Sequence, residues 1–117
     1  MSPKSPYYAV IFSSIRTTEA DHLYASTAKD IFSLAAKQPG YLGYETARDS
    51  TRHGITVIYW DSLENIKRWK TDAEHLVVQK MGRDIFYKEY HVRIAKVERE
   101  YRWSKRNSRE SDKRNLI

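Results

Sequence analysis

Apolar and polar residues alternate with two different periods along this chain, and the change of period marks the predicted elements. Residues 7–15 (YYAVIFSSI) are rich in β-branched and aromatic side chains and predict a largely buried strand. Thr18 and Asp21 resemble a capping box, a pair of side chains that satisfies free backbone N–H groups at a helix start. A helical stripe follows at spacings of four, three and four residues: Tyr24, Ala28, Ile31 and Ala35. The sequence Pro39-Gly40 ends this helix.

Three further strands are predicted after this helix. Residues 41–48 (YLGYETAR) and 55–60 (ITVIYW) form two of them, joined by the polar hairpin loop 49–54. The last strand is long and runs from about residue 86 to residue 103. Its apolar residues fall first on even and then on odd numbers: Tyr90, Val92 and Ile94, then Val97, Tyr101 and Trp103. This change of parity predicts a β-bulge near Ala95 or Lys96.

Two helical segments are predicted between the third and the fourth strand. Asp61 and Glu64 form a second cap signature and open a short helix. Three apolar residues lie on one side of it: Leu63, Ile66 and Trp69. Thr71 and Glu74 repeat the cap signature, which predicts a helix break and a second helical segment running to about Arg83.

The predicted order is β-α-β-β-α-β, which indicates an α+β protein of the ferredoxin-like class. Its four-stranded antiparallel sheet carries both helices on one face. The second, third and fourth strands nevertheless have large apolar side chains at both parities, for example Tyr41 and Tyr44, or Tyr59 and Trp60. The two helices cannot cover all of them, because alternate residues of a strand point to opposite faces. We therefore expect a homodimer that packs sheet to sheet, with part of the last strand reaching across to the partner.

Length and composition agree with one small globular domain. The chain has 117 residues and no cysteine, which excludes disulfides and thiolate metal sites. Its longest apolar run, Tyr7 to Phe12, is too short for a membrane span or a signal-peptide core, so we expect a cytoplasmic protein with no membrane partner.

The net charge of +6 is concentrated toward the C-terminus. Residues 104–117 carry five basic side chains against Glu110 and Asp112, a net +3, and have little apolar material. We predict a domain over residues 1–103 and a basic, flexible tail over 104–117. A phosphate-binding arm is the alternative, but five charges on a flexible chain bind weakly, so nucleic acid is not the expected partner.

Three segments resemble the antibiotic biosynthesis monooxygenase (ABM) superfamily: PGYLGYETARD (39–49), ITVIYWDSLENIKRWK (55–70) and AEHLVVQKMGRDIFY (73–87). The resemblance covers about residues 6–103. It implies a dimeric ferredoxin-like α+β barrel. Members of this group include quinone-forming monooxygenases, heme-degrading enzymes and proteins without an assigned activity.

The quinone-forming branch implies a monooxygenase that needs no cofactor, in which a deprotonated phenolic substrate reacts directly with dioxygen. Such a protein supplies an aromatic-lined cavity, a base for the phenol and exclusion of water. We predict His75 as the base and Trp69 as a broad cavity wall, with Tyr59 and His91 binding a flat aromatic ligand. Three of these residues have a plainer interpretation, as core packing for Trp69, as a surface or capping position for His75 and as a solvent-facing strand position for His91.

Other chemistries have weaker support. No pair of His or carboxylate residues has the spacing of a strong metal site, and neither a phosphate-binding glycine loop nor a Gly-x-Ser-x-Gly elbow is present. Trp60 and Trp69 match the two tryptophans of the heme-degrading branch. However, the first strand has no asparagine, and His75 falls about one helical turn before the position of the heme ligand. A non-catalytic dimer with the same cavity, either small-molecule-binding or structural, stays open as a second class of function.

Overall fold

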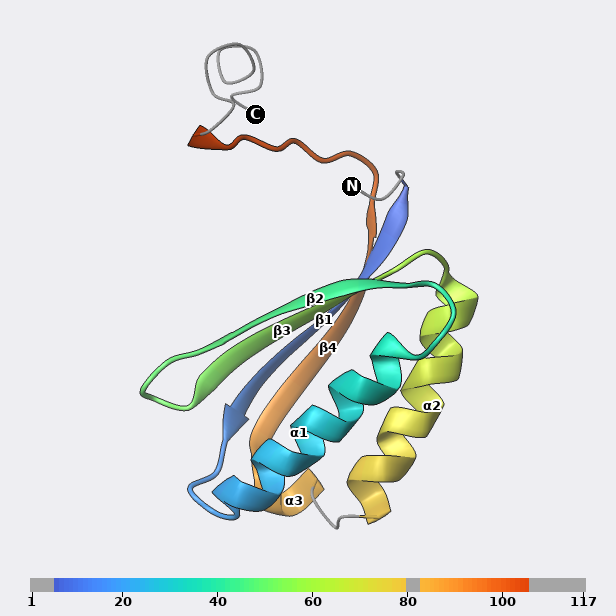
Figure 1. Ribbon diagram of the computed structural model, residues 1–117. Coiled ribbons are helices and arrows are strands. Elements are labelled where there is room, and N and C mark those ends of the chain that lie inside the picture. Colours follow the sequence, from blue (N-terminus) through green and yellow to red (C-terminus); the bar gives the residue numbers. More distant parts are fainter. Residues whose placement is uncertain (1–5, 80–82, 106–117) are drawn as a thin grey trace.

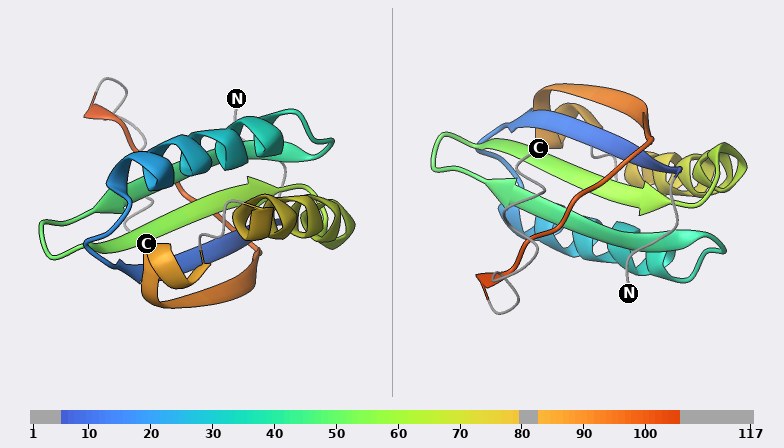
Figure 2. Two further views of the ribbon diagram at one scale, coloured as in Figure 1. Left: turned by 90° about the horizontal axis from the view of Figure 1, so that it is seen from below. Right: turned by 90° about the horizontal axis from the view of Figure 1, so that it is seen from above.

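The computed structural model describes residues 6–79 and 83–105. Its elements run β1 (Tyr7–Arg16), α1 (Asp21–Ala36), β2 (Tyr41–Arg48), β3 (His53–Trp60), α2 (Leu63–Gln79), α3 (Arg83–Phe86) and β4 (Tyr87–Val97). The four strands form one antiparallel sheet in the order β2-β3-β1-β4, and both long helices lie on the same face of it (Figure 1, Figure 2). The predicted ferredoxin-like α+β fold is confirmed.

Strand register decides which side chains face the helices. Tyr8 pairs with Trp60 and Val10 pairs with Ile58, so the even-numbered residues of β1 and β3 share one face. These residues pack against α1 and α2 in a core of Val10, Ala35, Ile58, Trp60, Ile66, Trp69 and Ala73. None of the helices in the described part of the chain is both long and apolar enough to cross a membrane.

The start of α1 differs from the predicted capping box. Its N-cap is Ala20, which has a positive φ of 56° and makes no side-chain capping hydrogen bond. Asp21 instead accepts from Arg16 Nη1 and Arg52 Nη1, each at 2.9 Å. The prediction for Thr18 is therefore wrong, because a buried guanidinium at the end of β1 recruits the carboxylate that the local pattern assigned to the helix.

The predicted break between Trp69 and Thr71 is also absent, since α2 is one continuous helix. The Thr71 hydroxyl donates to the Lys67 carbonyl at 3.1 Å, four residues back within the same helix. A single apolar face continues across the predicted break through Ile66, Trp69 and Ala73. Packing of this apolar face on the sheet stabilises one continuous helix, although Thr71 and Glu74 have the spacing of a helix cap.

The last strand ends earlier than predicted, at Val97. Pairing is regular through Ala95 and Lys96, and the register shift of β4 lies at its other end, where Ile15 pairs with Glu89 and Arg16 with Tyr87. The bulge predicted near Ala95 is therefore wrong. Val97 still pairs with Tyr7, on the sheet face opposite the helices, and the chain leaves the sheet after it (Figure 1), so Tyr101 and Trp103 do not belong to the strand. Most of the predicted tail, residues 106–117, lies outside the described residues.

Candidate functional site

A cavity of about 310 Å³ lies between the sheet and the two long helices. This volume is at the lower end of the roughly 300–1,000 Å³ typical of small-molecule sites. The wall is mostly apolar and aromatic, with contributions from β1 and β3 (Val10, Phe12, Thr56, Ile58), α1 (Tyr24, Thr27, Ala28, Ile31, Phe32), α2 (Trp69, Lys70, Ala73, Glu74, Val77) and the α3–β4 region (Phe86, Tyr87, Tyr90, Val92). Such a wall suits a flat, largely apolar molecule.

Trp69 forms part of this wall from α2. Its side chain is 7% exposed, and its ring centre lies 5.4 Å from that of Trp60, with the planes tilted by 36°. Trp60 is fully buried at the end of β3 and so fixes the position of its neighbour. The result is a rigid aromatic surface on the helix side of the cavity.

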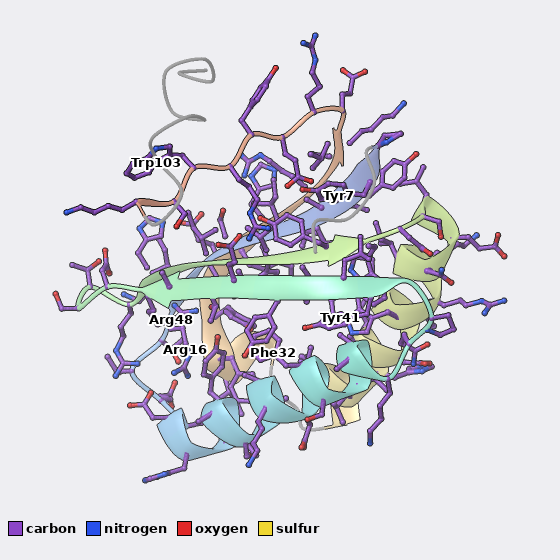
Figure 3. The ribbon with its side chains drawn as sticks, turned by 45° about the horizontal axis from the view of Figure 1, so that its top comes forward. Tyr7, Arg16, Phe32, Tyr41, Arg48 and Trp103 are labelled. Carbon is purple, nitrogen blue, oxygen red and sulfur yellow. The ribbon has the colours of Figure 1, made fainter. Side chains whose placement is uncertain are left out.

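The part of the cavity wall that Tyr24 forms, its polar end, has positive charge behind it, from two arginines that contact Tyr24 and do not line the cavity themselves. The Arg16 guanidinium lies 3.8 Å from the centre of the Tyr24 ring, and Arg48 Nη2 donates to the Tyr24 hydroxyl at 3.1 Å. Figure 3 shows Arg16 and Arg48 near one end of the molecule, on the side of the sheet that faces α1. Because Arg48 occupies a lone pair of the Tyr24 oxygen, the Tyr24 hydroxyl hydrogen is directed elsewhere.

Arg16 is held in place although it is 4% exposed. Its Nε donates to the Phe86 carbonyl at 3.3 Å, and its Nη2 donates to the Glu19 carbonyl at 2.9 Å. The Asp21 carboxylate accepts hydrogen bonds from Arg52 and from Arg16 Nη1, and these hydrogen bonds hold the pKa of Asp21 well below its usual range. A buried guanidinium with every donor group engaged is a fixed charge rather than a mobile one.

Tyr87 borders the cavity beside Tyr24, with the two ring centres 5.9 Å apart. Burial, together with the neighbouring Tyr24 phenol, raises the pKa of Tyr87. Tyr87 is therefore protonated at neutral pH and acts as a hydrogen-bond donor rather than as a base.

The structure does not bring the four residues predicted from the sequence together. Trp69 lines the cavity, whereas His75 is exposed on α2 and is not part of the cavity wall. Tyr59 and His91 lie at odd positions of β3 and β4, on the sheet face opposite the helices. There, the Tyr59 hydroxyl donates to Glu45 at 2.7 Å, and this hydrogen bond with burial raises the pKa of Tyr59 to about 12. A catalytic role for any of the four stays a prediction.

Sequence reasoning missed the polar end of the cavity. One signal was present, because Arg16 continues the even-numbered, helix-facing series of β1 that includes Tyr8, Val10 and Phe12. A charged residue at an inward position indicates a specific buried partner. Within the described residues, no group of three or more His, Asp or Glu side chains is arranged to hold a metal ion.

Comparisons with known proteins agree with this architecture. The sequence model of the antibiotic biosynthesis monooxygenase family matches residues 6–81. The uncharacterized protein YqjZ of Bacillus subtilis (strain 168) is 48% identical over 99 residues, which cover 85% of this chain and 86% of that protein. A jasmonate monooxygenase ABM of Pyricularia oryzae is 27% identical over 92 residues, which cover 77% of this chain but only 43% of that protein.

A solved structure gives the same result at the level of the fold. SnoaB, a cofactor-independent oxygenase from Streptomyces nogalater, superposes with a TM-score of 0.60 at 13% identity, covering 79% of this chain and 92% of that chain. The matched region spans β1 to α2 and thus includes Trp69 and the α1 wall of the cavity. This chain belongs to the antibiotic biosynthesis monooxygenase family.

Proposed function

We propose that this protein is a small cofactor-independent monooxygenase that oxidises an aromatic or quinol-like molecule with dioxygen. The observation that carries the proposal is the aromatic cavity of about 310 Å³, which has Trp69 in its wall and, at its polar end, Tyr24 in contact with Arg16 and Arg48. The names of two similar proteins support it, a monooxygenase that acts on jasmonate and a cofactor-independent oxygenase.

The reaction requires the substrate to lose a proton before it meets dioxygen. In the net conversion, one oxygen atom enters the ring system as a ketone oxygen and the other leaves as water, so the four electrons gained by dioxygen come from the substrate. The protein binds the flat molecule, excludes water and stabilises the anion. Tyr24 serves the last task, because Arg16 and Arg48 contact it, and positive charge next to a phenol strengthens the hydrogen bond that its hydroxyl donates to an anionic oxygen.

The proton must go to a group that reaches the substrate. Tyr24 is the proposed relay, because Tyr24 lines the cavity and its hydroxyl is oriented by Arg48, and the proton finally leaves in the water formed from dioxygen. His75 is the alternative predicted from the sequence. Its exposed position on α2 gives it no part of the cavity wall. Turnover of the Tyr24 and His75 variants separates these two assignments.

Oxygen consumption is the direct test. Purified protein is incubated with a panel of hydroxyanthrones and catechols, and uptake is compared with that of heat-denatured protein to correct for spontaneous oxidation. We expect uptake above this background with at least one substrate and one water formed per dioxygen. Tight binding without uptake would favour the non-catalytic binding protein, and stoichiometric binding of added heme would favour the heme-degrading branch.

We also propose that the protein works as a homodimer through the sheet face opposite the helices. Ile55 of β3 is 51% exposed on this face, and Tyr101 and Trp103 of the segment after β4 are 54% and 53% exposed. Figure 3 shows Trp103 on the side of the sheet away from α1. Large apolar side chains exposed in one region are typical of a protein interface.

A further inference from the structure

An irregularity in β2 turns two tyrosines toward the same helix. The pairing of β2 with β3 shifts between Tyr41 and Gly43, so that Tyr41 pairs with Trp60 and Tyr44 pairs with Ile58. Both partners belong to the core that packs against the helices. In a regular strand, positions 41 and 44 would point to opposite faces, but the extra residue of a β-bulge brings them to the same face. Tyr41 and Tyr44 therefore both face α1, contrary to the expectation from their parity.

The two tyrosines and α1 border a groove of about 470 Å³ that is open to solvent. Figure 3 shows Tyr41 and Phe32 between β2 and α1. Two residues of α1 that line the groove, Ala28 and Phe32, also line the cavity between the sheet and the helices. They are four positions apart and so lie on one side of the helix. These two side chains form a wall that the cavity and the groove share.

Phe32 is the bulk of this shared wall, since Ala28 has only a methyl group. The Tyr44 ring stacks on the Phe32 ring, with the ring centres 4.4 Å apart and the planes within 10° of parallel. Tyr44 lines the groove but not the cavity, and it is 45% exposed. The wall at Trp69 is backed by the fully buried Trp60, whereas the wall at Phe32 is backed by one half-exposed ring. Phe32 is therefore where the cavity lies closest to a second space that could hold part of a ligand.

We propose that Phe32 determines how long a molecule the cavity accepts, because its ring closes the cavity toward the groove, and that Tyr44 is a positioning residue that holds this ring in place. A molecule longer than the cavity needs the space that the ring occupies, and forcing extra atoms into a packed site is unfavourable. This inference rests on the proposed function only in taking the cavity as the ligand site. It adds a limit on ligand length, which the proposed chemistry does not set.

The probes are 2-naphthol and 6-(4-hydroxyphenyl)-2-naphthol, which share a fused-ring phenol and differ in one further ring at its far end. Their dissociation constants are measured by calorimetry without dioxygen, and the readout is the ratio of the constant of the longer compound to that of 2-naphthol. We expect this ratio to be at least about 10 for the wild type. Because the assay measures binding alone, a protein that oxidises no substrate can still pass or fail it.

Phe32→Ala removes the ring and joins the cavity to the groove, so the ratio should fall at least about tenfold relative to the wild type. Phe12→Ala is the matched control, because Phe12 lines the cavity from β1 but does not line the groove, and its ring stacks on Tyr90 at 5.2 Å. This control removes the same side-chain volume without opening the cavity toward the groove. Its ratio should change less than about threefold.

Tyr44→Ala tests the positioning role, because Tyr44 is outside the cavity wall and a direct contact with the ligand cannot explain an effect. The Phe32 ring loses its stacking partner and can turn into the groove, so the ratio should fall at least about threefold. Tyr44→Phe keeps the ring and should keep the wild-type ratio. Tyr41→Ala should keep it too, since Tyr41 lines the same groove but its ring packs on Trp60, with the centres 6.0 Å apart.

Tyr44→Ala also covers the case in which Phe32→Ala does not fold, since it changes a half-exposed residue. The proposal is overturned if the folded Phe32→Ala or Tyr44→Ala protein leaves the ratio unchanged. It is equally overturned if Phe12→Ala lowers the ratio as much as Phe32→Ala does, or Tyr41→Ala as much as Tyr44→Ala. A wild type that binds the longer compound as tightly as 2-naphthol, or that binds neither compound, contradicts it as well.

Discussion

The guanidinium carbon of Arg16 lies 3.8 Å from the centre of the Tyr24 ring, and this contact joins the end of β1 to the first turns of α1. The same guanidinium binds the Phe86 carbonyl, which comes just before β4. One buried side chain therefore connects three segments at the polar end of the cavity. Its planar fork of donors reaches acceptors in different directions, which a lysine ammonium cannot reproduce.

Arg16→Lys is expected to destabilise the protein by about 2 kcal/mol, since it keeps the charge but leaves buried carbonyl groups without donors. Urea denaturation gives the free energy of unfolding directly. Arg52→Lys is the control, because the Arg52 side chain is 34% exposed and binds the same Asp21. That variant should cost less than about 1 kcal/mol. Equal losses in the two variants would contradict a special role for Arg16.

Asp21 makes stability depend on pH in the acid range. Its folded pKa is lowered by hydrogen bonds from Arg52 and Arg16, so the stability that it contributes is complete above its unfolded pKa of about 3.8 and is lost as the pH falls below this value. Urea midpoints measured between pH 6 and pH 2 should decrease less steeply for Asp21→Asn than for the wild type. Asp72→Asn should keep the wild-type slope, because Asp72 makes no ion pair within the described residues.

The sequence predicted most of the fold because its strong signals are local. The second strand, residues 41–48, was predicted with its observed bounds, since Pro39-Gly40 precedes it and a polar hairpin loop follows it. Two predictions from local residues were wrong, because contacts with distant residues determine the structure there. Packing of α2 on the sheet keeps the helix continuous at Thr71, and Asp21 pairs with Arg16 and Arg52 instead of forming a capping box with Thr18.

The site was harder to predict for the same physical reason. Trp69 stands in an apolar helical stripe and in a family motif, so two signals pointed to it. The polar end of the cavity depends on contacts between residues far apart in sequence, such as Arg16 with the Phe86 carbonyl 70 positions away. His75, Tyr59 and His91 were selected by residue type, and strand parity and helix phase then placed them outside the cavity wall.

Trp69→Phe should weaken ligand binding more than it slows the chemical step. The smaller ring gives up contact area and one N–H donor, but the charged end of the cavity stays intact. We expect the dissociation constant for a hydroxyanthrone of the oxygen-uptake panel to rise about tenfold and kcat with the same compound to fall less than about threefold, since each 1.4 kcal/mol of lost binding corresponds to a factor of ten. Trp103→Phe is the matched control, because Trp103 is 53% exposed and outside the cavity wall. An equal effect of both changes would argue against the cavity as the binding site.

Tyr24→Phe and His75→Ala test the two candidates for the proton relay. General acid–base groups typically contribute about 10²–10⁴-fold, so Tyr24→Phe should lower kcat by about 100-fold, whereas the exposed His75 should tolerate alanine with less than about a twofold change. Oxygen uptake at saturating substrate gives both values, and melting temperatures show whether either variant is merely destabilised. A loss of about 100-fold in His75→Ala, with Tyr24→Phe unaffected, would restore His75 as the base.

Ile55→Asp should dissociate the proposed dimer. The side chain is 51% exposed near the start of β3, on the sheet face that no helix covers, and a carboxylate there would be buried against the partner without a counter-charge. Light scattering at micromolar concentration should give the dimer mass for the wild type and the monomer mass for this variant. Leu63→Asp is the matched control, because Leu63 is 55% exposed at the start of α2 and should leave the mass unchanged. A monomeric wild type would contradict the proposed dimer. A dimer that survives Ile55→Asp but not Leu63→Asp would move the interface to the helix side.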